Sequence, residues 1–198
     1  MIQPDYTSYS WLEQDSTAVA PLLLGWELVT HIGTVTTAGR ITETEAYMGS
    51  RDPASHAFRG LTNRTAPMFE DGGFIYVYLS YGIHACVNIV TGPKGTASAV
   101  LIRALQPTRG QSTMITRRRS SNLLNLCDGP GKLTQALGIG LGLSGTHLGP
   151  TVSLKPPQIP LSTNQIVTTT RVGISKATDK PWRFLIKNNL FIPHQQRE

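Results

Sequence analysis

The segment FIYVYLSYGIHACVNIV, residues 74–90, carries the strongest structural signal in the sequence. Its two halves are rich in β-branched and aromatic residues, which favour strands. Between them stands Ser80-Tyr81-Gly82, and glycine accepts the backbone conformations that tight turns require. The segment therefore predicts a β-hairpin with Tyr81 near its tip.

Outward from this hairpin, the sequence predicts further strands and two helices. The predicted strands span residues 26–32, 40–47, 98–105, 168–174 and 182–187. The predicted helices span 17–24, capped by Asp15 or Ser16, and 131–137. Pro107 is expected to end the third strand, and residues 138–165 are expected to be irregular. With no internal repeat and no clear linker, the pattern indicates a single domain of the α+β class.

The composition narrows the class of protein. The chain has 198 residues, of which 39% are hydrophobic, so it is long enough to bury a sizeable core. A net charge of +6 suits a polyanionic partner such as nucleic acid, although many basic proteins bind none. No apolar run is long enough for a membrane span, and the N-terminus lacks the pattern of a secretion signal. We expect an intracellular protein whose two cysteines, Cys86 and Cys127, are reduced and structural.

Two acidic residues stand out in the predicted strand at 40–47. Alternation places Ile41, Glu43, Glu45 and Tyr47 on one face, with the two carboxylates about 7 Å apart. A partly buried carboxylate would have a shifted pKa and could handle protons. The alternatives are an exposed acidic face or a salt bridge to an arginine such as Arg103.

Four of the six tyrosines fall between residues 47 and 81. Aromatic side chains that face a pocket can sandwich a planar ring, and a cationic ring gains from their π faces. Ordinary packing within a sheet is the alternative. The run Arg117-Arg118-Arg119 allows two interpretations as well, namely phosphate contacts or a solvated loop.

Other motifs carry little weight. Gly140-x-Gly142-x-x-Gly145 matches a dinucleotide-binding pattern by letter, but it follows a predicted helix rather than a strand. Gly131-Lys132 lacks the remaining residues of a phosphate-binding loop. No pair of histidines or cysteines has the spacing of a zinc site, so we expect no metal.

Five segments taken together resemble the alkyladenine DNA glycosylase family, also called 3-methyladenine or methylpurine DNA glycosylases. They are RITETEAY (40–47), YVYLSYGIHACVNI (76–89), VLIRALQP (100–107), CDGPGKLTQAL (127–137) and RVGI (171–174). The resemblance extends in order over residues 16–190, which it predicts to be the glycosylase domain. Residues 1–15 and 191–198 are then expected to be terminal tails.

The resemblance implies a fold and an activity. The fold would be one mixed domain around a curved antiparallel sheet, with the hairpin protruding into the minor groove of DNA. The activity would be base excision, in which a damaged purine is flipped out of duplex DNA and its N-glycosidic bond is hydrolysed to leave an abasic site. The resemblance further implies a monomer with no cofactor. No lysine adjoins the second acid of Glu-Thr-Glu-Ala-Tyr, so we expect no lyase step.

The resemblance also assigns catalytic roles. Glu45, the second acid of the motif, would be the general base that activates water, with Glu43 in support. Arg103 and the backbone carbonyl of Val172 would help to position that water. One carboxylate can both activate water and stabilise an oxocarbenium-like sugar.

The remaining roles concern the base and the DNA. Tyr47, His56 and Tyr78 would line the pocket and stack around the flipped base. Asn88 would lie at the pocket floor and disfavour the 2-amino group of normal guanine. Tyr81 would fill the gap left in the duplex. Candidates for contacts with the DNA backbone are Lys132, Arg171, Arg117, Arg118 and Arg119.

Two other functions remain open on the sequence. A nucleic-acid-binding domain without activity would use the same basic and aromatic residues but would not need Glu45. A hydrolase of free nucleosides would not need Tyr81 or the arginine run. The chain also departs from the family motif Thr-Pro-Arg-Asn, which here reads Thr62-Asn63-Arg64-Thr65.

Overall fold

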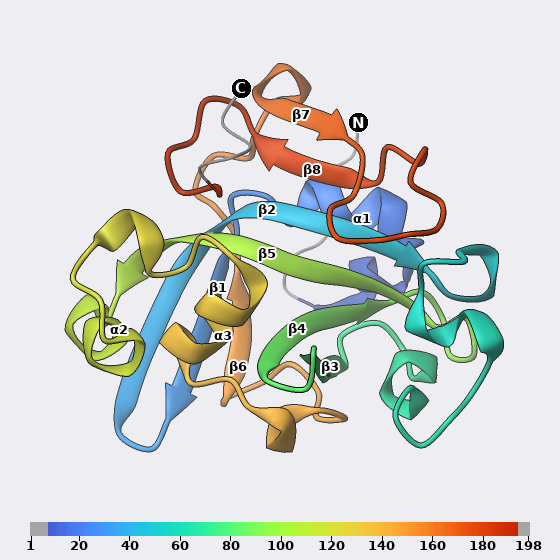
Figure 1. Ribbon diagram of the computed structural model, residues 1–198, viewed down its shortest axis with the longest axis horizontal. Helices are drawn as coiled ribbons and strands as arrows, with labels where there is room; N and C mark the ends of the chain where they lie inside the picture. Colours follow the sequence, from blue (N-terminus) through green and yellow to red (C-terminus); the bar gives the residue numbers. More distant parts are fainter. Residues whose placement is uncertain (1–7, 194–198) are drawn as a thin grey trace.

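The computed structural model describes residues 8–193, which form the expected α+β domain around a curled antiparallel sheet (Figure 1). The strands are β1 (Glu27–Ile32), β2 (Val35–Met48), β3 (Ile75–Ser80), β4 (His84–Thr91), β5 (Ser98–Arg109), β6 (Val152–Lys155), β7 (Ile166–Thr169) and β8 (Arg183–Ile186). The helices are α1 (Ser16–Leu22), α2 (Gln111–Arg118) and α3 (Pro130–Leu137). Short 3₁₀ helices are η1 (Ser10–Glu13), η2 (Gly49–Arg51), η3 (His56–Arg59), η4 (Ala66–Phe69), η5 (Leu123–Asn125), η6 (Leu141–Leu143) and η7 (Thr163–Gln165).

The long strand β2 organises the sheet. The strand order is β3-β4-β5-β2-β1-β6, and every pair is antiparallel. One edge of β2 pairs first with β1 and then, further along, with β8, which in turn pairs with β7. The change of partner lets the sheet curl, and Figure 1 shows β7 and β8 lying across its upper end. Glu43 and Glu45 lie in the part of β2 that pairs with β8.

The register of β2 against β5 shifts between Ile41 and Thr44, as at a β-bulge. A bulge changes which face the following side chains occupy. Ile41 therefore joins the same core cluster as Ala46, although simple alternation placed these two residues on opposite faces. Glu43 and Glu45 still share a neighbour, because both carboxylates lie close to Arg103 Nε.

The core begins earlier in the chain than predicted. Trp11 and Leu12 of η1 are buried in the main hydrophobic cluster, so the domain includes at least part of the expected tail 1–15. At the other end, Ile192 is buried and the Phe191 carbonyl accepts a hydrogen bond from the Thr42 hydroxyl. Residues 1–7 and 194–198 of the expected tails lie outside the described residues.

The predicted hairpin forms from β3 and β4, paired from Ile75–Ile89 to Ser80–His84. The Ile83 amide bonds back to the Ser80 carbonyl, and both intervening residues have positive φ, 51° at Tyr81 and 74° at Gly82. This is the pattern of a type I′ turn, which glycine adopts freely and tyrosine does not. Helix α3 supports the hairpin close to its turn, where the Thr134 hydroxyl donates to the carbonyl of Ala85, the partner of Leu79.

Several boundaries differ from the sequence prediction. β5 continues through Pro107. This part of β5 pairs with β2 along one edge only, so the missing proline amide removes no hydrogen bond along the unpaired edge. The basic run 117–119 forms the end of a helix, α2, and its C-cap, rather than a loop. β6 pairs with β1 inside the stretch expected to be irregular. Residues 170–174 are not a strand, and they turn inward toward β2.

The helices of residues 8–193 are all too short or too polar to cross a bilayer.

Candidate active site

A cavity of about 860 Å³ opens at one end of the sheet. Its walls come from the end of β2, the segment 53–68, the hairpin and residues 172–176. Figure 1 shows the segment between β2 and β3, in teal, folded over this end of the sheet. Residues more than a hundred positions apart in the chain thus meet around one hollow.

Glu45 lies behind the wall of this cavity and has no exposed surface. The Val172 amide donates to its Oε1 at 2.8 Å, and the Tyr47 hydroxyl donates to its Oε2 at 2.9 Å. Arg103 Nε lies 3.4 Å from Oε1. All three of these neighbours line the cavity, so the carboxylate is separated from it by a single layer of side chains and backbone.

Glu45 holds its proton more tightly than a carboxyl group in water does. Burial raises the pKa of this carboxyl above its ordinary value, opposed by the Arg103 charge and by the hydrogen bonds from Val172 and Tyr47. A carboxylate with a raised pKa is a stronger base than a solvated one. Buried carboxylates of this kind gather at functional sites.

Glu43 holds the arginine that approaches Glu45. Its Oε1 accepts from Arg103 Nε at 2.8 Å and from Arg183 Nε at 2.6 Å. Burial acts to lower the pKa of Arg103, but Glu45 and Glu43 more than offset it and keep the pKa above its ordinary value. The ion pair with Arg103, which the sequence left as one alternative, therefore exists. The other alternative, an exposed acidic face, is wrong, because both carboxylates are buried.

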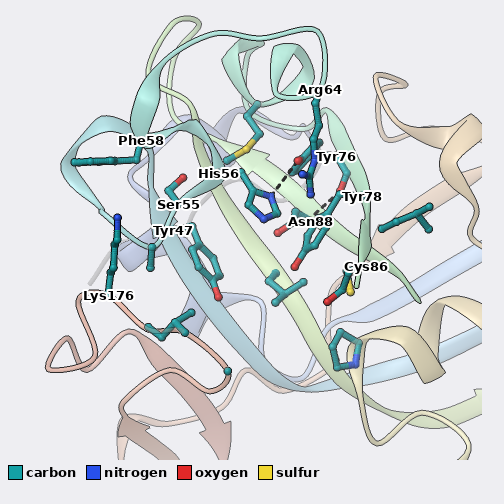
Figure 2. A pocket seen from close by; sticks show the side chains of 18 of the residues that line it. Tyr47, Ser55, His56, Phe58, Arg64, Tyr76, Tyr78, Cys86, Asn88 and Lys176 are labelled. Atoms are coloured by element: carbon teal, nitrogen blue, oxygen red, sulfur yellow. Dashed lines mark hydrogen bonds between the residues drawn. The ribbon is translucent and has the colours of Figure 1, made fainter. Parts of the chain in front are cut away.

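An aromatic wall faces the cavity on the hairpin side (Figure 2). The Tyr76 and Tyr78 rings are stacked with centroids 5.6 Å apart, and His56 meets the Tyr78 ring edge-on at 4.4 Å. His56 Nδ1 is 3.1 Å from the Tyr76 hydroxyl. Burial, followed by the charge of Arg64, lowers the pKa of His56, so the imidazole is neutral at pH 7.

Asn88 and Tyr47 complete the pocket expected from the sequence. Asn88 is almost fully buried, lines the cavity, and donates through Nδ2 to the Tyr76 carbonyl at 3.1 Å. Figure 2 shows Tyr47 facing the aromatic wall from β2. Burial raises the pKa values of Tyr47 and Tyr78, so both phenols stay protonated. The structure thus brings Tyr47, His56, Tyr78 and Asn88 around one cavity.

Tyr81 stands at the rim rather than inside. Its side chain is 89% exposed, and it is flanked by Leu79 and Ile83, which are also exposed. A bulky residue with positive φ is strained, and such strain is concentrated at functional sites. An apolar tip beside a cavity is poorly suited to water and well suited to a partner surface.

The expected basic residues divide into two groups. Arg117 donates to the Ala136 carbonyl at 3.0 Å, and Arg118 donates to the Gln135 side chain, so both help to fix α3. Arg118 also donates to the Leu126 carbonyl at 3.1 Å. Arg119 is exposed at the end of α2. Lys132 pairs with Asp128 at 2.7 Å and keeps a partly exposed side chain.

Arg171 does not lie where a phosphate contact requires it. Its side chain has no exposed surface and forms a two-bond ion pair with Asp52. Its guanidinium also packs against the rings of Tyr47 and Trp182. The predicted backbone contact is wrong for Arg171, because the segment that carries it folds inward against β2.

Sequence reasoning missed several residues of the site. Tyr76 shares a strand face with Tyr78, and that alternation was sufficient to predict it. Arg64, whose guanidinium lies 5.7 Å from the Tyr78 ring centroid, belongs to the segment that departs from the family motif. No local pattern indicated Asp52 or Lys176, which reach the site through long-range folding. Across residues 8–193, no three His, Cys, Asp or Glu side chains gather closely enough to hold a metal ion.

Similarity to known proteins covers almost the whole chain. Residues 10–190 match the family described as methylpurine-DNA glycosylase. A protein of Methanoculleus marisnigri is 50% identical over 186 residues, which cover 92% of this chain and 96% of the relative.

Two further relatives come from bacteria. A protein of Prosthecochloris aestuarii is 47% identical over 154 residues, covering 78% of this chain and 74% of the relative. A protein of Rhodopseudomonas palustris strain HaA2 is 48% identical over 178 residues, covering 88% of this chain and 83% of the relative. All three relatives bear the name "Putative 3-methyladenine DNA glycosylase". The resemblance expected from the motifs is confirmed, and the chain belongs to the methylpurine-DNA glycosylase family.

Proposed function

We propose that this protein excises alkylated purines, 3-methyladenine among them, from DNA by hydrolysing the N-glycosidic bond. The observation that carries the proposal is the Glu45 carboxylate, buried one layer behind an aromatic cavity in a chain of this family. A methylpurine must leave the duplex before its glycosidic bond can reach such a carboxylate. The proposed substrate is therefore double-stranded DNA, acted on inside the cell by one chain that supplies the whole site.

The cavity fits a flipped purine in size and in chemistry. Ligand pockets of about 300–1,000 Å³ hold small planar molecules, and this one has about 860 Å³. Tyr47, Tyr76 and Tyr78 offer π faces, which attract the positive charge of an alkylated purine. The neutral His56 adds a ring without adding a repelling charge. Asn88 provides a polar floor that a 2-amino group would crowd.

In the proposed chemistry, Glu45 accepts a proton from water while the water oxygen bonds to C1′ of the sugar. The glycosidic electron pair leaves with the base, so a cationic alkylpurine departs neutral. The products are the free base and an abasic sugar bearing the new hydroxyl. The ionised carboxylate also stabilises the oxocarbenium-like charge that develops on the sugar, in a site where burial strengthens electrostatic interactions.

The hydrogen bonds of Glu45 leave room for this water. A carboxylate has about four acceptor positions. The Val172 amide occupies one position on Oε1, and the Tyr47 hydroxyl occupies one on Oε2. Arg103 Nε lies 3.4 Å from Oε1 as a charge partner, while its N–H donates to Glu43. A water on the remaining position would contact the cavity beside Arg103 and the Val172 backbone. We propose that these two groups orient it.

The hairpin supplies the other half of the reaction. An extruded nucleotide leaves a gap in the stack, and an apolar side chain inserted there hinders its return. We propose that Tyr81 enters the gap from the minor groove. Of the basic candidates, Arg119 is exposed and Lys132 is partly exposed, so we propose these two for phosphate contacts. Arg117 and Arg118 are also partly exposed, but their guanidinium groups already donate to backbone carbonyls.

The test is release of the base from DNA methylated with dimethyl sulfate, with chromatography of the products. We expect free 3-methyladenine from duplex DNA and none from the matching free nucleoside. Binding to methylated DNA without release would favour a binding module. Equal release from the free nucleoside would favour a nucleoside hydrolase. Either result would overturn the proposal, and a Glu45→Gln sample controls for contaminating activity.

A further inference from the structure

We propose that Asp52 and Arg171 form a clamp that positions both the general base and the base pocket. The inference rests on the proposed function and deepens it. Neither side chain reaches the cavity, so the clamp would act through the residues that do. It replaces the phosphate contact that the sequence suggested for Arg171.

The clamp is fully buried and geometrically specific. Arg171 Nη2 donates to Asp52 Oδ1 at 2.8 Å, and Nη1 donates to Oδ2. Nη1 also donates to the Ala46 carbonyl of β2 at 3.0 Å. Both side chains have no exposed surface. Two parallel bonds between a planar guanidinium and a carboxylate fix orientation as well as distance.

On one side, Asp52 fixes the segment that leads to His56. Its Oδ2 accepts from the Met48 amide at 3.3 Å and its Oδ1 from the Ala54 amide at 3.1 Å. Its carbonyl accepts from the Ser55 amide at 2.8 Å. Ser55 caps the short helix η3, whose first residue is His56. The position of the imidazole in the cavity therefore depends on Asp52.

On the other side, Arg171 fixes two neighbours of Glu45. It directly precedes Val172, whose amide bonds to Glu45 Oε1. Its guanidinium carbon lies 4.7 Å from the Tyr47 ring centroid and 5.0 Å from that of Trp182. The same cation thus supports the ring that donates to Glu45 Oε2 and the loop that donates to Oε1.

A buried ion pair is weak evidence of stabilisation, because removing two charges from water is costly. Its retention here is better explained by what it connects. The clamp joins β2, the His56 segment and the Val172 segment at one point, across 119 positions of sequence. Removing it should free the Val172 amide from Glu45 and remove the support of the Tyr47 ring. The other groups that face this carboxyl stay in place, namely Arg103, Glu43, Tyr78 and Arg183.

A freed Val172 amide has a measurable consequence. That hydrogen bond holds the pKa of Glu45 down, against the effect of burial. Its loss raises the pKa further, so less of the general base is ionised at low pH. The low-pH limb of the excision rate should therefore move to higher pH. General loss of folded protein does not predict such a displacement in the surviving native enzyme.

The experiment measures single-turnover base release against pH for Arg171→Met, Arg171→Lys and Asp52→Asn. The control is Arg51→Met, which removes an exposed arginine from the neighbouring position. We expect Arg171→Met to lose about 10²-fold at low pH, as for a misplaced catalytic group, and less as the pH rises. For Arg171→Lys and Asp52→Asn, the low-pH limb of the rate should move less far in the same direction. These two variants still test the clamp if Arg171→Met fails to fold. Arg51→Met should match the wild type.

A double variant tests whether the two residues act together. If they form one clamp, Asp52→Asn with Arg171→Met should cost little more than the worse single change. Additive losses, or pH limbs that stay in place for all the folded variants, would overturn the clamp. Wild-type protein that releases no methylated base would instead overturn the proposed function, so the two failures are distinguishable.

Discussion

Two regions of the site differ in burial, namely the charged residues around Glu45, called the floor below, and the tip of the hairpin. At the floor, Glu43, Glu45, Arg103 and Arg183 are buried and held by short ion pairs and hydrogen bonds. At the tip, Tyr81 is exposed and its backbone has positive φ. The floor shields its charges from bulk solvent and fixes them in place. The tip keeps apolar surface in water, where only a partner can cover it.

This difference in burial predicts which property a substitution in each region should change. Changes at the floor should alter the chemical step and folding stability together, because charge and packing coincide there. Changes at the tip should alter the handling of DNA while leaving the fold intact. The predictions below can break or sharpen that division.

The largest effect is expected for Glu45→Gln. Loss of the general base should lower the rate of base release by about 10²–10⁴-fold. Gel-shift binding to methylated DNA should persist, since the cavity and the hairpin are unchanged. Single-turnover release provides the measurement, with Glu43→Gln as the neighbouring comparison. Release at the wild-type rate would transfer the role to another residue, Glu43 first.

The same variant should change how stability depends on pH. Because burial raises the pKa of Glu45 above its ordinary value of 4.5, the folded state binds this proton more tightly than the unfolded state. The stability contributed is therefore present below pH 4.5 and lost as the pH rises through the raised value. Glutamine cannot ionise, so urea midpoints of Glu45→Gln should gain on the wild type as the pH rises. A constant difference would contradict this assignment.

Glu43→Leu should cause the largest loss of stability at the floor. It leaves Arg103 and Arg183 buried together without their shared carboxylate. Removing one partner of a buried ion pair typically costs about 3–5 kcal/mol. Urea unfolding measures the loss, and Glu70→Leu, which removes a surface partner of Lys94, should leave the midpoint near the wild type. Equal midpoints for the two variants would refute the role of Glu43 as an anchor.

The sequence predicted what local patterns encode. Alternation and Gly82 were sufficient for the hairpin. The spacing of Glu43 and Glu45 predicted that both carboxylates share one face, with a salt bridge to Arg103 as one alternative. The bulge near Thr42 was not predicted, because a register shift depends on the partner strand. It moved Ile41 into the core and left the two acids together.

Contacts between distant segments were beyond local patterns. The family resemblance made Arg171 a candidate for contacts with the DNA backbone, yet Asp52 holds it inside the fold. For Arg117 and Arg118 the sequence allowed phosphate contacts or a solvated loop, yet both donate to backbone carbonyls, of Ala136 and Leu126. In each case, a buried acceptor elsewhere in the chain decides the position of the arginine.

At the tip, Tyr81→Ser should weaken base flipping. A ring that replaces base stacking is worth about 1–3 kcal/mol, so the flipped population should fall by about 5–150-fold. The melting temperature should hardly change, because an 89% exposed side chain buries little. Fluorescence of 2-aminopurine beside a lesion reports the flip, and Tyr81→Phe should retain it. Normal flipping with a much lower melting temperature would make Tyr81 a structural residue.

The smallest effect concerns Arg119 and divides the arginine run. Each phosphate contact contributes about 0.9 to the slope of log affinity against log salt. Arg119→Asn, which suits the positive φ at this position, should therefore reduce the affinity change between 50 and 200 mM salt by about three- to four-fold. Arg117→Ala should keep the wild-type slope and lower the melting temperature instead, because it removes a bond to the Ala136 carbonyl. The opposite result would be a flatter salt dependence for Arg117→Ala and an unchanged one for Arg119→Asn. The Arg117 guanidinium would then have to leave α3 to reach DNA, and the division between packed and exposed arginines would be wrong.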